Sequence, residues 1–282
     1  MNAALIHAVL AKGVHDPRRL AEWVADPQAL RALGVDPASL DLQALRHFSG
    51  LALKVRHNGL RDAYPHSFRL LDVAGLEIEL FAAYALDHAV SGAPLALTNE
   101  ARAQALIDFI RSWHDSRLQT HAMLWDLLRH EQALSQLAHA DVAVPELPFA
   151  RLTRPTASGV PHLRGAMLLH ELQYDPRAVV ATLRQQVPDL DSTSPSPCAL
   201  CYWRPPGAAA VSLVQLDAFG HAVLQAADGL RSVAEIAAEL GLSRRVSTRV
   251  PARVLELLGQ LQDTGLLAFA ARRPAASKSA LA

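Results

Sequence analysis

The sequence of 282 residues has few cysteines, few aromatic residues and no excess charge of either sign. It contains 2 cysteines and 5% aromatic residues, and its 27 Lys and Arg equal its 27 Asp and Glu. Two cysteines are too few for a disulfide framework, and the missing basic excess argues against a dedicated nucleic-acid-binding protein. With 51% hydrophobic residues, the chain is too apolar to be disordered. Its core must be built mainly from Ala, Leu and Val, which favours helices.

Long apolar runs and targeting signals are also missing. No stretch of about 18 uncharged apolar residues occurs, so we expect no membrane-spanning helix and no membrane partner. The start of the chain, MNAALIHAVLAKG, lacks the basic residues and the small-residue cleavage site of a secretory signal. The sequence therefore predicts a cytoplasmic protein with both thiols reduced.

The first half of the chain has the pattern of successive helices. Asp-Pro pairs at residues 16–17, 26–27 and 36–37 each place a capping side chain before a proline, as at the start of a helix. Apolar residues then recur at helical spacing as far as residue 138. We expect residues 1–140 to form an all-helical bundle.

Two helical stretches in this half carry more detailed expectations. The stretch from Asp41 to Leu60 is expected to present roughly one apolar stripe, made of Leu45, Phe48, Leu51, Leu53 and Val55. In a later amphipathic helix, His130 and Glu131 are expected at a solvated or interface edge.

The composition changes after residue 140. Residues 141–163 are rich in proline and small residues, which is typical of a linker. Three stretches have the pattern of strands, at residues 166–174, 199–204 and 210–216. Three short helices follow them, and the second opens with a Ser-x-x-Glu capping box at Ser232. Residues 164–272 are therefore predicted to form a winged-helix-like domain with a small antiparallel sheet, and residues 273–282 a frayed tail. The predicted fold class is α+β.

Cys198 and Cys201 form the most conspicuous motif that could carry chemistry. A zinc site needs two more ligands, and no second C-x-x-C or H-x3-H motif supplies them. A redox pair favours a helix N-terminus, whereas this pair enters a predicted strand, where residues three apart face opposite sides. We favour structural or incidental cysteines and leave their role unassigned.

No other catalytic or metal-binding pattern stands out. The 13 histidines show no metal-binding spacing. The sequence also has no nucleophile–base pair, no glycine-rich phosphate loop and no paired carboxylates. We therefore predict no catalytic residue and no metal site in this chain.

Polar residues gather at a helix break around residues 56–69, within an otherwise apolar bundle. Two interpretations are open. The polar side chains could satisfy backbone groups that the bend frees, or they could form a docking surface for an anionic group or a partner protein.

A cluster of arginines precedes and enters the last predicted helix. Its members are Arg244, Arg245, Arg249 and Arg253. A winged-helix protein could place this helix against DNA, although the chain is neutral and the helix also holds Glu256 and Asp263. The same parts suit a peptide. An extended peptide would add to the edge of the strand at 210–216, the helix would wall the groove, and the arginines would favour acidic peptide residues.

Two resemblances to known families favour the peptide. The segment 216–240, with Asp228-Gly229 and then Ser232 to Ile236, resembles the small PqqD-like recognition elements (RREs) of ribosomal-peptide (RiPP) biosynthesis, and residues 254–267 fit the same pattern. The segments 56–61 and 64–68, with 174–176 and 202–204, resemble partner subunits of DUF692-type multinuclear non-heme iron oxidases. These subunits include the methanobactin partner and the TglI-like partner of 3-thiaglutamate biosynthesis, and the length and two-part layout look closer to the latter. The resemblance covers most of residues 40–270.

These resemblances imply a non-catalytic subunit without a cofactor of its own. Iron would lie in a separate TIM-barrel oxidase, forming a heterodimer with this chain, which would bind the precursor peptide and present its cysteine to that iron. The expected peptide groove consists of Val211, Leu213 and Gln215 on the strand and Val250, Arg253, Val254 and Leu257 on the helix. The expected oxidase contact consists of Arg56, His57, Asn58, Arg61 and His66. The competing hypotheses are a winged-helix DNA-binding regulator with a helical sensor domain and a metal-dependent enzyme that uses the cysteine pair.

Overall fold

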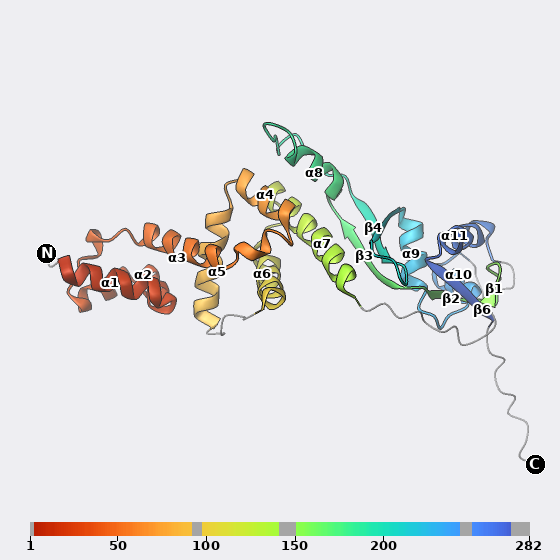
Figure 1. The fold of residues 1–282 in the computed structure, drawn as a ribbon, viewed down its shortest axis with the longest axis horizontal. Coiled ribbons are helices and arrows are strands. Elements are labelled where there is room, and N and C mark those ends of the chain that lie inside the picture. The colour runs from red at the N-terminus through yellow and green to blue at the C-terminus, as the bar shows by residue number, and fades with distance from the viewer. Residues whose placement is uncertain (1–2, 92–97, 141–150, 243–249, 272–282) are drawn as a thin grey trace, which may run out of the picture. The chain divides into compact units, whose positions relative to one another are not determined.

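The computed structural model describes residues 3–91, 98–140, 151–242 and 250–271 (Figure 1). The chain divides into two compact units. The first comprises Met1–Glu131 and Pro176–Ser194, and the second comprises Gln132–Asp175 and Pro195–Ala282. This division differs from the predicted boundaries, because it falls within a long helix, α7 (Gln119–His139), and assigns α8 (Pro176–Leu183) to the first unit.

The described part of the first unit is helical, as predicted. Besides α8 and most of α7, its α-helices are α1 (Ala3–His15), α2 (Pro17–Ala25), α3 (Leu42–Arg56), α4 (Pro65–Val73), α5 (Glu77–Ser91) and α6 (Asn99–Trp113). Short 3-10 helices occupy Pro27–Leu33, Pro37–Ser39 and Asn58–Leu60. The predicted Asp-Pro caps are confirmed, because the carboxylates of Asp16, Asp26 and Asp36 accept hydrogen bonds from backbone N–H groups at 3.3, 3.1 and 3.2 Å.

The first unit is organised around the crossing of α3 and α5. At the crossing, Gly50 packs so tightly that a Cβ on it would lie 2.6 Å from the backbone nitrogen of Ala82. Only glycine permits this approach. Large side chains such as Leu80 and Phe81 of α5 are completely buried beside it.

The single apolar stripe predicted along α3 is wrong. Leu45 and Leu53 are buried, whereas Phe48, Leu51 and Val55 are 55, 41 and 60% exposed. The reason is the helical period, which turns the two sets of residues to opposite sides of α3. The helix therefore has an apolar face toward α5 and a second apolar face toward solvent.

The second unit combines two small antiparallel sheets with helices, which confirms the predicted α+β class. One sheet has the order β3-β4-β5, formed by Ala166–Leu172, Cys198–Arg204 and Ser212–Leu216. The other has the order β1-β6-β2, formed by Arg151–Leu152, Leu267–Ala271 and Gly159–Leu163. Between β5 and β6 the chain forms α9 (Ala218–Ala226), α10 (Val233–Glu239) and α11 (Ala252–Asp263). Among the helices of the described residues, none is long and apolar enough to span a bilayer.

The segment predicted to be a linker, residues 141–163, is ordered structure where it is described. It contains β1 and β2, which both pair with β6. Its prolines suggested a linker, but β2 lies at the edge of its sheet, where a proline such as Pro161 is tolerated. The predicted tail at 273–282 lies outside the described residues.

Strand β4 is the centre of the second unit because both of its faces are covered. Leu200 and Tyr202 pack in one cluster with Ala133 and Leu137 of α7. On the other face, Cys201 and Trp203 join a larger apolar cluster that contains residues of α9, α10, α11 and β6. This alternation explains why a strand in an antiparallel sheet is almost continuously apolar.

Candidate functional site

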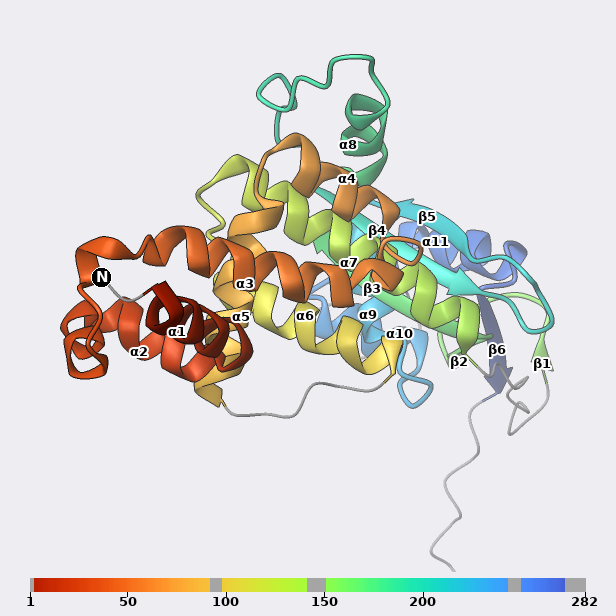
Figure 2. The same cartoon turned by 60° about the vertical axis from the view of Figure 1, so that its left-hand side comes forward.

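The open edge of β5 is the first element of the candidate site. In the described part of the chain, β5 pairs with β4 and with no other strand, in the register Ser212↔Trp203 to Leu216↔Ala199 (Figure 2). An edge strand presents a row of unpaired backbone N–H and C=O groups, which an extended segment can extend as a further strand. Strand β3 forms the opposite edge of the same sheet.

Apolar side chains of β5 and α11 pack against one cluster, which Met167 and Leu169 of β3 also contact. Val214 and Leu216 of β5 are half-buried and pack against the same cluster as Val250 and Leu257. Val254, on the same helix as Leu257, is completely buried in it. A strand added to β5 would therefore lie beside a half-buried apolar surface.

The strand residues predicted for the peptide groove point away from this surface. Val211 and Leu213 pack with the α7-side cluster instead. Gln215 is exposed and lies opposite Leu200, which belongs to that same cluster, so the alternation of the strand places it on the same side. Of the four predicted helix residues, Val250, Val254 and Leu257 belong to the cluster against which Val214 and Leu216 of β5 pack. Whether any of these residues binds a peptide stays a prediction.

Arg253 is held at the C-terminal end of β5 by two interactions. Its guanidinium lies 4.2 Å from the ring centroid of Phe219, and its Nη2 lies 3.3 Å from Oδ2 of Asp217. Asp217 also caps α9 by accepting a hydrogen bond from the Gly220 N–H at 2.6 Å. Both charged side chains are about two-thirds exposed, at 69 and 64%, so their pair contributes little to stability. The predicted Arg244, Arg245 and Arg249 lie outside the described residues.

Two turns set the positions of the helices behind this surface. The predicted capping box is confirmed, because the Ser232 N–H donates to Glu235 at 2.8 Å and the Glu235 N–H donates to the Ser232 hydroxyl at 3.3 Å. In the Asp228-Gly229 turn, Gly229 has a φ of 78°, which favours glycine. The Asp228 carboxylate accepts hydrogen bonds from the backbone N–H groups of Leu230 and Arg231, which lower the pKa of Asp228.

The cysteine pair does not converge. Cys201 belongs to the cluster with α9–α11 and Cys198 to the cluster with α7, so the predicted opposite orientation is confirmed. Burial raises the pKa of the Cys201 thiol to about 12. That thiol is therefore protonated at neutral pH, and in this state it is neither a nucleophile nor a metal ligand. Within the described ranges, no group of three or more His, Cys, Asp or Glu side chains could hold a metal ion.

The polar residues predicted to contact an oxidase differ in burial and in their partners. His57 is only 1% exposed, its Nδ1 lies 2.9 Å from the Leu53 carbonyl oxygen, and it contacts the rings of Phe81 and Tyr84. It cannot be a surface contact, because the end of α3 turns it into the core. Arg61 pairs with the buried Glu77, which Lys54 also contacts at 2.7 Å.

The remaining three predicted contacts are accessible. Arg56 and Asn58 are exposed, and His66 is half-buried. They remain candidates for the predicted contact.

Glu131 satisfies the start of α4, a role that the sequence interpretation missed. Its carboxylate accepts hydrogen bonds from the backbone N–H groups of His66 and Ser67 at 2.8 and 2.9 Å, and from the Ser67 hydroxyl at 2.6 Å. Glu131 is 5% exposed, so the predicted solvated edge is wrong for this residue. The backbone N–H groups at this helix start are therefore satisfied by a side chain of α7, which is not one of the polar residues of the 56–69 cluster.

The second unit thus presents three antiparallel strands followed by three helices, with an open edge on the third strand. Residues 210–267 match the family model of coenzyme PQQ synthesis protein D (PqqD). The C-terminal part of the chain contains a PqqD-like domain. The matched segment spans β5, α9, α10 and α11 and ends at the first residue of β6. No curated protein matches the chain.

Proposed function

We propose that this chain recognises a ribosomally made precursor peptide and presents it to a separate modifying enzyme. The observation that carries the proposal is the open edge of β5 within the segment that matches PqqD. The PqqD family consists of non-catalytic elements that bind peptides in RiPP biosynthesis. Strand addition to β5 would supply backbone hydrogen bonds, and the neighbouring side chains would supply sequence preference.

The residues beside the edge define the peptide that would bind. Val214 and Leu216, with Phe219, Val250 and Leu257, offer a half-buried apolar surface. Arg253 offers a cation whose present partner, Asp217, is exposed. The bound segment should therefore be extended, with apolar side chains on alternate residues and a carboxylate near the C-terminal end of β5.

Amide hydrogen exchange of the full chain, with and without the precursor peptide, tests strand addition. We expect the peptide to slow exchange of β5 amides, because their free N–H groups gain acceptors. The β3 edge is the internal control, since it is the other edge of the same sheet and lies outside the segment that matches PqqD. Peptide binding that protects β3 and not β5 would contradict the proposal. Binding of duplex DNA with a steep salt dependence, and no binding of peptide, would favour the regulator instead.

The finer proposal concerns the enzyme. We propose that the partner is a DUF692-type iron oxidase of the 3-thiaglutamate type, and that this chain is its TglI-like subunit. The support is the resemblance of segments 56–61 and 64–68 to such subunits. Holding the peptide raises the effective concentration of its cysteine at the iron of the partner. Co-purification tests the proposal, with iron expected in the partner chain and neither iron nor zinc in this chain alone.

A further inference from the structure

A second half-buried apolar surface lies beside β5, on the side of the sheet opposite the cluster that contains α11 residues. Val211, directly before β5, and Leu213 within it pack against the cluster that includes Leu137 of α7. Leu134 of α7 packs against the same cluster, and all three packed side chains are half-buried. We refer to Leu134, Val211 and Leu213 as the α7-side face. A half-buried apolar side chain gains free energy when a neighbouring segment covers the rest of it.

Arg204, the last residue of β4, fixes the end of α7 beside the turn from which β5 begins. Its Nη1 donates hydrogen bonds to the carbonyl oxygens of Leu137, Ala138 and Ala140 at 2.9, 2.7 and 3.0 Å. Its Nε donates to the carbonyl oxygen of Ala208, in the turn between β4 and β5, at 3.0 Å. A cation at the last carbonyl groups of a helix also interacts favourably with the helix dipole. The last turn of α7 is therefore held close to the start of β5.

A strand added to the edge of β5 would have neighbours on both faces of the sheet. Its side chains would point alternately to the two faces, because successive residues of a strand face opposite sides. One set would lie beside Val214 and Leu216, which pack with α11 residues, and the other set beside the α7-side face. Gln215, further along β5 on the α7 side, is exposed, so the apolar part of that side ends before it. The two faces are therefore both apolar at the start of β5 and differ at its end.

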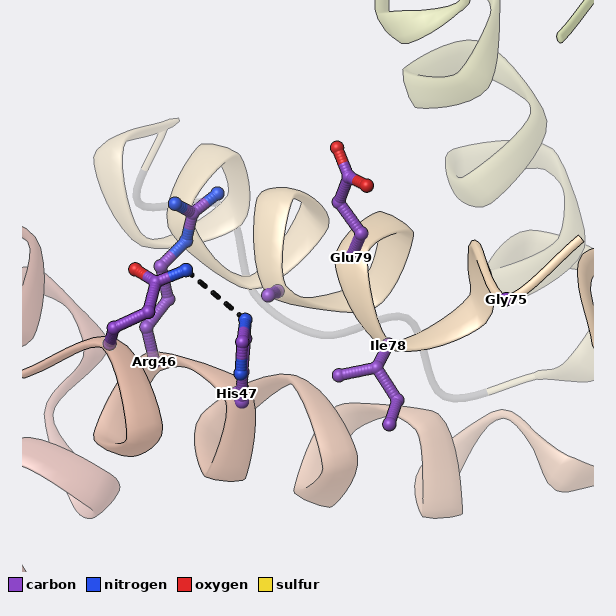
Figure 3. A pocket seen from close by; sticks show the side chains of 7 residues that line it. Arg46, His47, Gly75, Ile78 and Glu79 are labelled. Carbon is purple, nitrogen blue, oxygen red and sulfur yellow. Dashed lines mark hydrogen bonds between the residues drawn. The ribbon is translucent and has the colours of Figure 1, made fainter.

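A pocket in the first unit has a different lining. It has a volume of about 430 Å³ and lies between α3 and α5, with Arg46 and Glu79 among its lining residues (Figure 3). These two side chains have opposite charges. Beside them, Nε2 of Gln43 lies 3.1 Å from Nε2 of His47. A lining of this kind favours neither an apolar side chain nor one sign of charge, so the apolar surface beside β5 suits a peptide better.

We infer that the α7-side face is a second wall of the peptide groove. The bound segment is then apolar at consecutive residues beside the start of β5 and at alternate residues beside its end. Leu134 and Leu213 determine this preference, because they contact the side chains that point away from α11. The occupant is an extended segment, since only such a segment can pair with the backbone of an edge strand. This inference rests on the proposed function and refines the sequence of the peptide that would bind.

Fluorescence anisotropy of two labelled synthetic peptides with the full chain tests the second wall. Both peptides have Glu at each end. Between the ends, one has Val at every position and the other has Val alternating with Ser. We expect the all-Val peptide to bind about tenfold more tightly, because it covers apolar side chains on both faces of the sheet.

Three variants locate this preference. Leu134→Gln keeps a good helix former and Leu213→Thr keeps a good strand former, so each alters the α7-side face with little effect on its element. We expect each to weaken binding of the all-Val peptide several-fold and to leave the alternating peptide, whose valines lie on the α11 side, unchanged. The control is Gln136→Ala, at an exposed residue two positions along α7 from Leu134 that faces away from it and should keep the full preference. Thermal unfolding shows that each variant folds.

The other outcomes overturn the inference in recognisable ways. Equal affinity of the unaltered chain for the two peptides would show that only the α11 side selects side chains, and the proposed function would stand. A preference that survives both Leu134→Gln and Leu213→Thr would do the same. Equal weakening of both peptides in these variants would assign the α7-side face a structural role alone. If neither peptide binds, the inference fails, and amide exchange of β5 with the precursor peptide decides separately whether the proposed function stands.

Discussion

The two units bury polar groups to very different extents. Of the nine buried polar or charged side chains in the described residues, eight belong to the first unit and only Ser232 belongs to the second. The first unit uses residues such as Glu131, Glu77 and His57 to satisfy helix ends and neighbouring charges inside a helical bundle. The second unit caps the starts of α9 and α10 with the local side chains of Asp217 and Ser232, and fills its interior with apolar side chains. The first unit should therefore depend on individual polar contacts and on pH, and the second on packing.

Replacement of Glu131 should have the largest effect. Glu131→Ala removes three hydrogen bonds to a buried carboxylate and leaves the N–H groups at the start of α4 unsatisfied. We expect a loss of about 4 kcal/mol from the unfolding free energy of the first unit. Amide exchange of α4, followed with increasing denaturant, measures it. Glu131→Gln keeps an acceptor and should lose less, and an equal loss in both variants would contradict the capping role.

Truncation in the apolar core of the second unit should be the next largest effect. Leu258 is completely buried in the cluster between β4 and the helices. We expect Leu258→Ala to destabilise the second unit by about 3 kcal/mol, through lost burial and the cavity left behind. The loss should be the same at pH 5 and pH 7, because no charge changes. Chemical denaturation at the two pH values checks this. A strongly pH-dependent loss would break the contrast between the units.

The pH dependence of stability should be a smaller effect, concentrated in the first unit. Burial lowers the pKa of His57 and of His121 in the first unit, and of His162 in the second. These residues stay neutral in the folded chain while the unfolded chain takes up protons below about pH 6.5, the usual pKa of histidine. Stability is therefore complete above that pH and falls as the pH drops below it.

His57→Phe isolates the contribution of the most deeply buried of these residues. The variant keeps an aromatic ring between Phe81 and Tyr84 but cannot titrate. We expect the unfolding free energy of the first unit to fall less between pH 7 and pH 5 than it does in the unaltered chain. Denaturant titrations at both pH values measure the difference. An unchanged pH dependence would show that His57 does not stay neutral in the fold.

Features that depend on neighbours within a few residues were predictable. The Asp-Pro caps, the capping box at Ser232 and the opposite orientation of Cys198 and Cys201 all follow from local backbone geometry. The segment resembling PqqD was recognised for the same reason, because its pattern of turns and short helices lies within one continuous stretch of residues.

The candidate site was predictable in part. The strand and its open edge were expected, whereas the packing of Val214 and Leu216, and not of Leu213, with the cluster that contains α11 residues was not. Alternation along a strand establishes two faces and does not say which one meets a helix. Both faces of β5 are partly apolar, with Leu213 on one and Val214 on the other, so the pattern could not decide.

The sequence alone determined the helical first half, the strands and helices from residue 166 onward, and the PqqD-like segment within them. Tertiary structure decided what covers each face. Glu131 accepts a hydrogen bond from the N–H group of His66, which lies 65 residues earlier in the chain. His57 turns inward toward two aromatic rings, and Phe48, Leu51 and Val55 of α3 stay exposed because α5 covers the other side of the helix. The physical reason is that the repeat of a helix or strand fixes the direction in which each side chain points. Whether that side chain is buried depends on which distant segment of the chain packs against it.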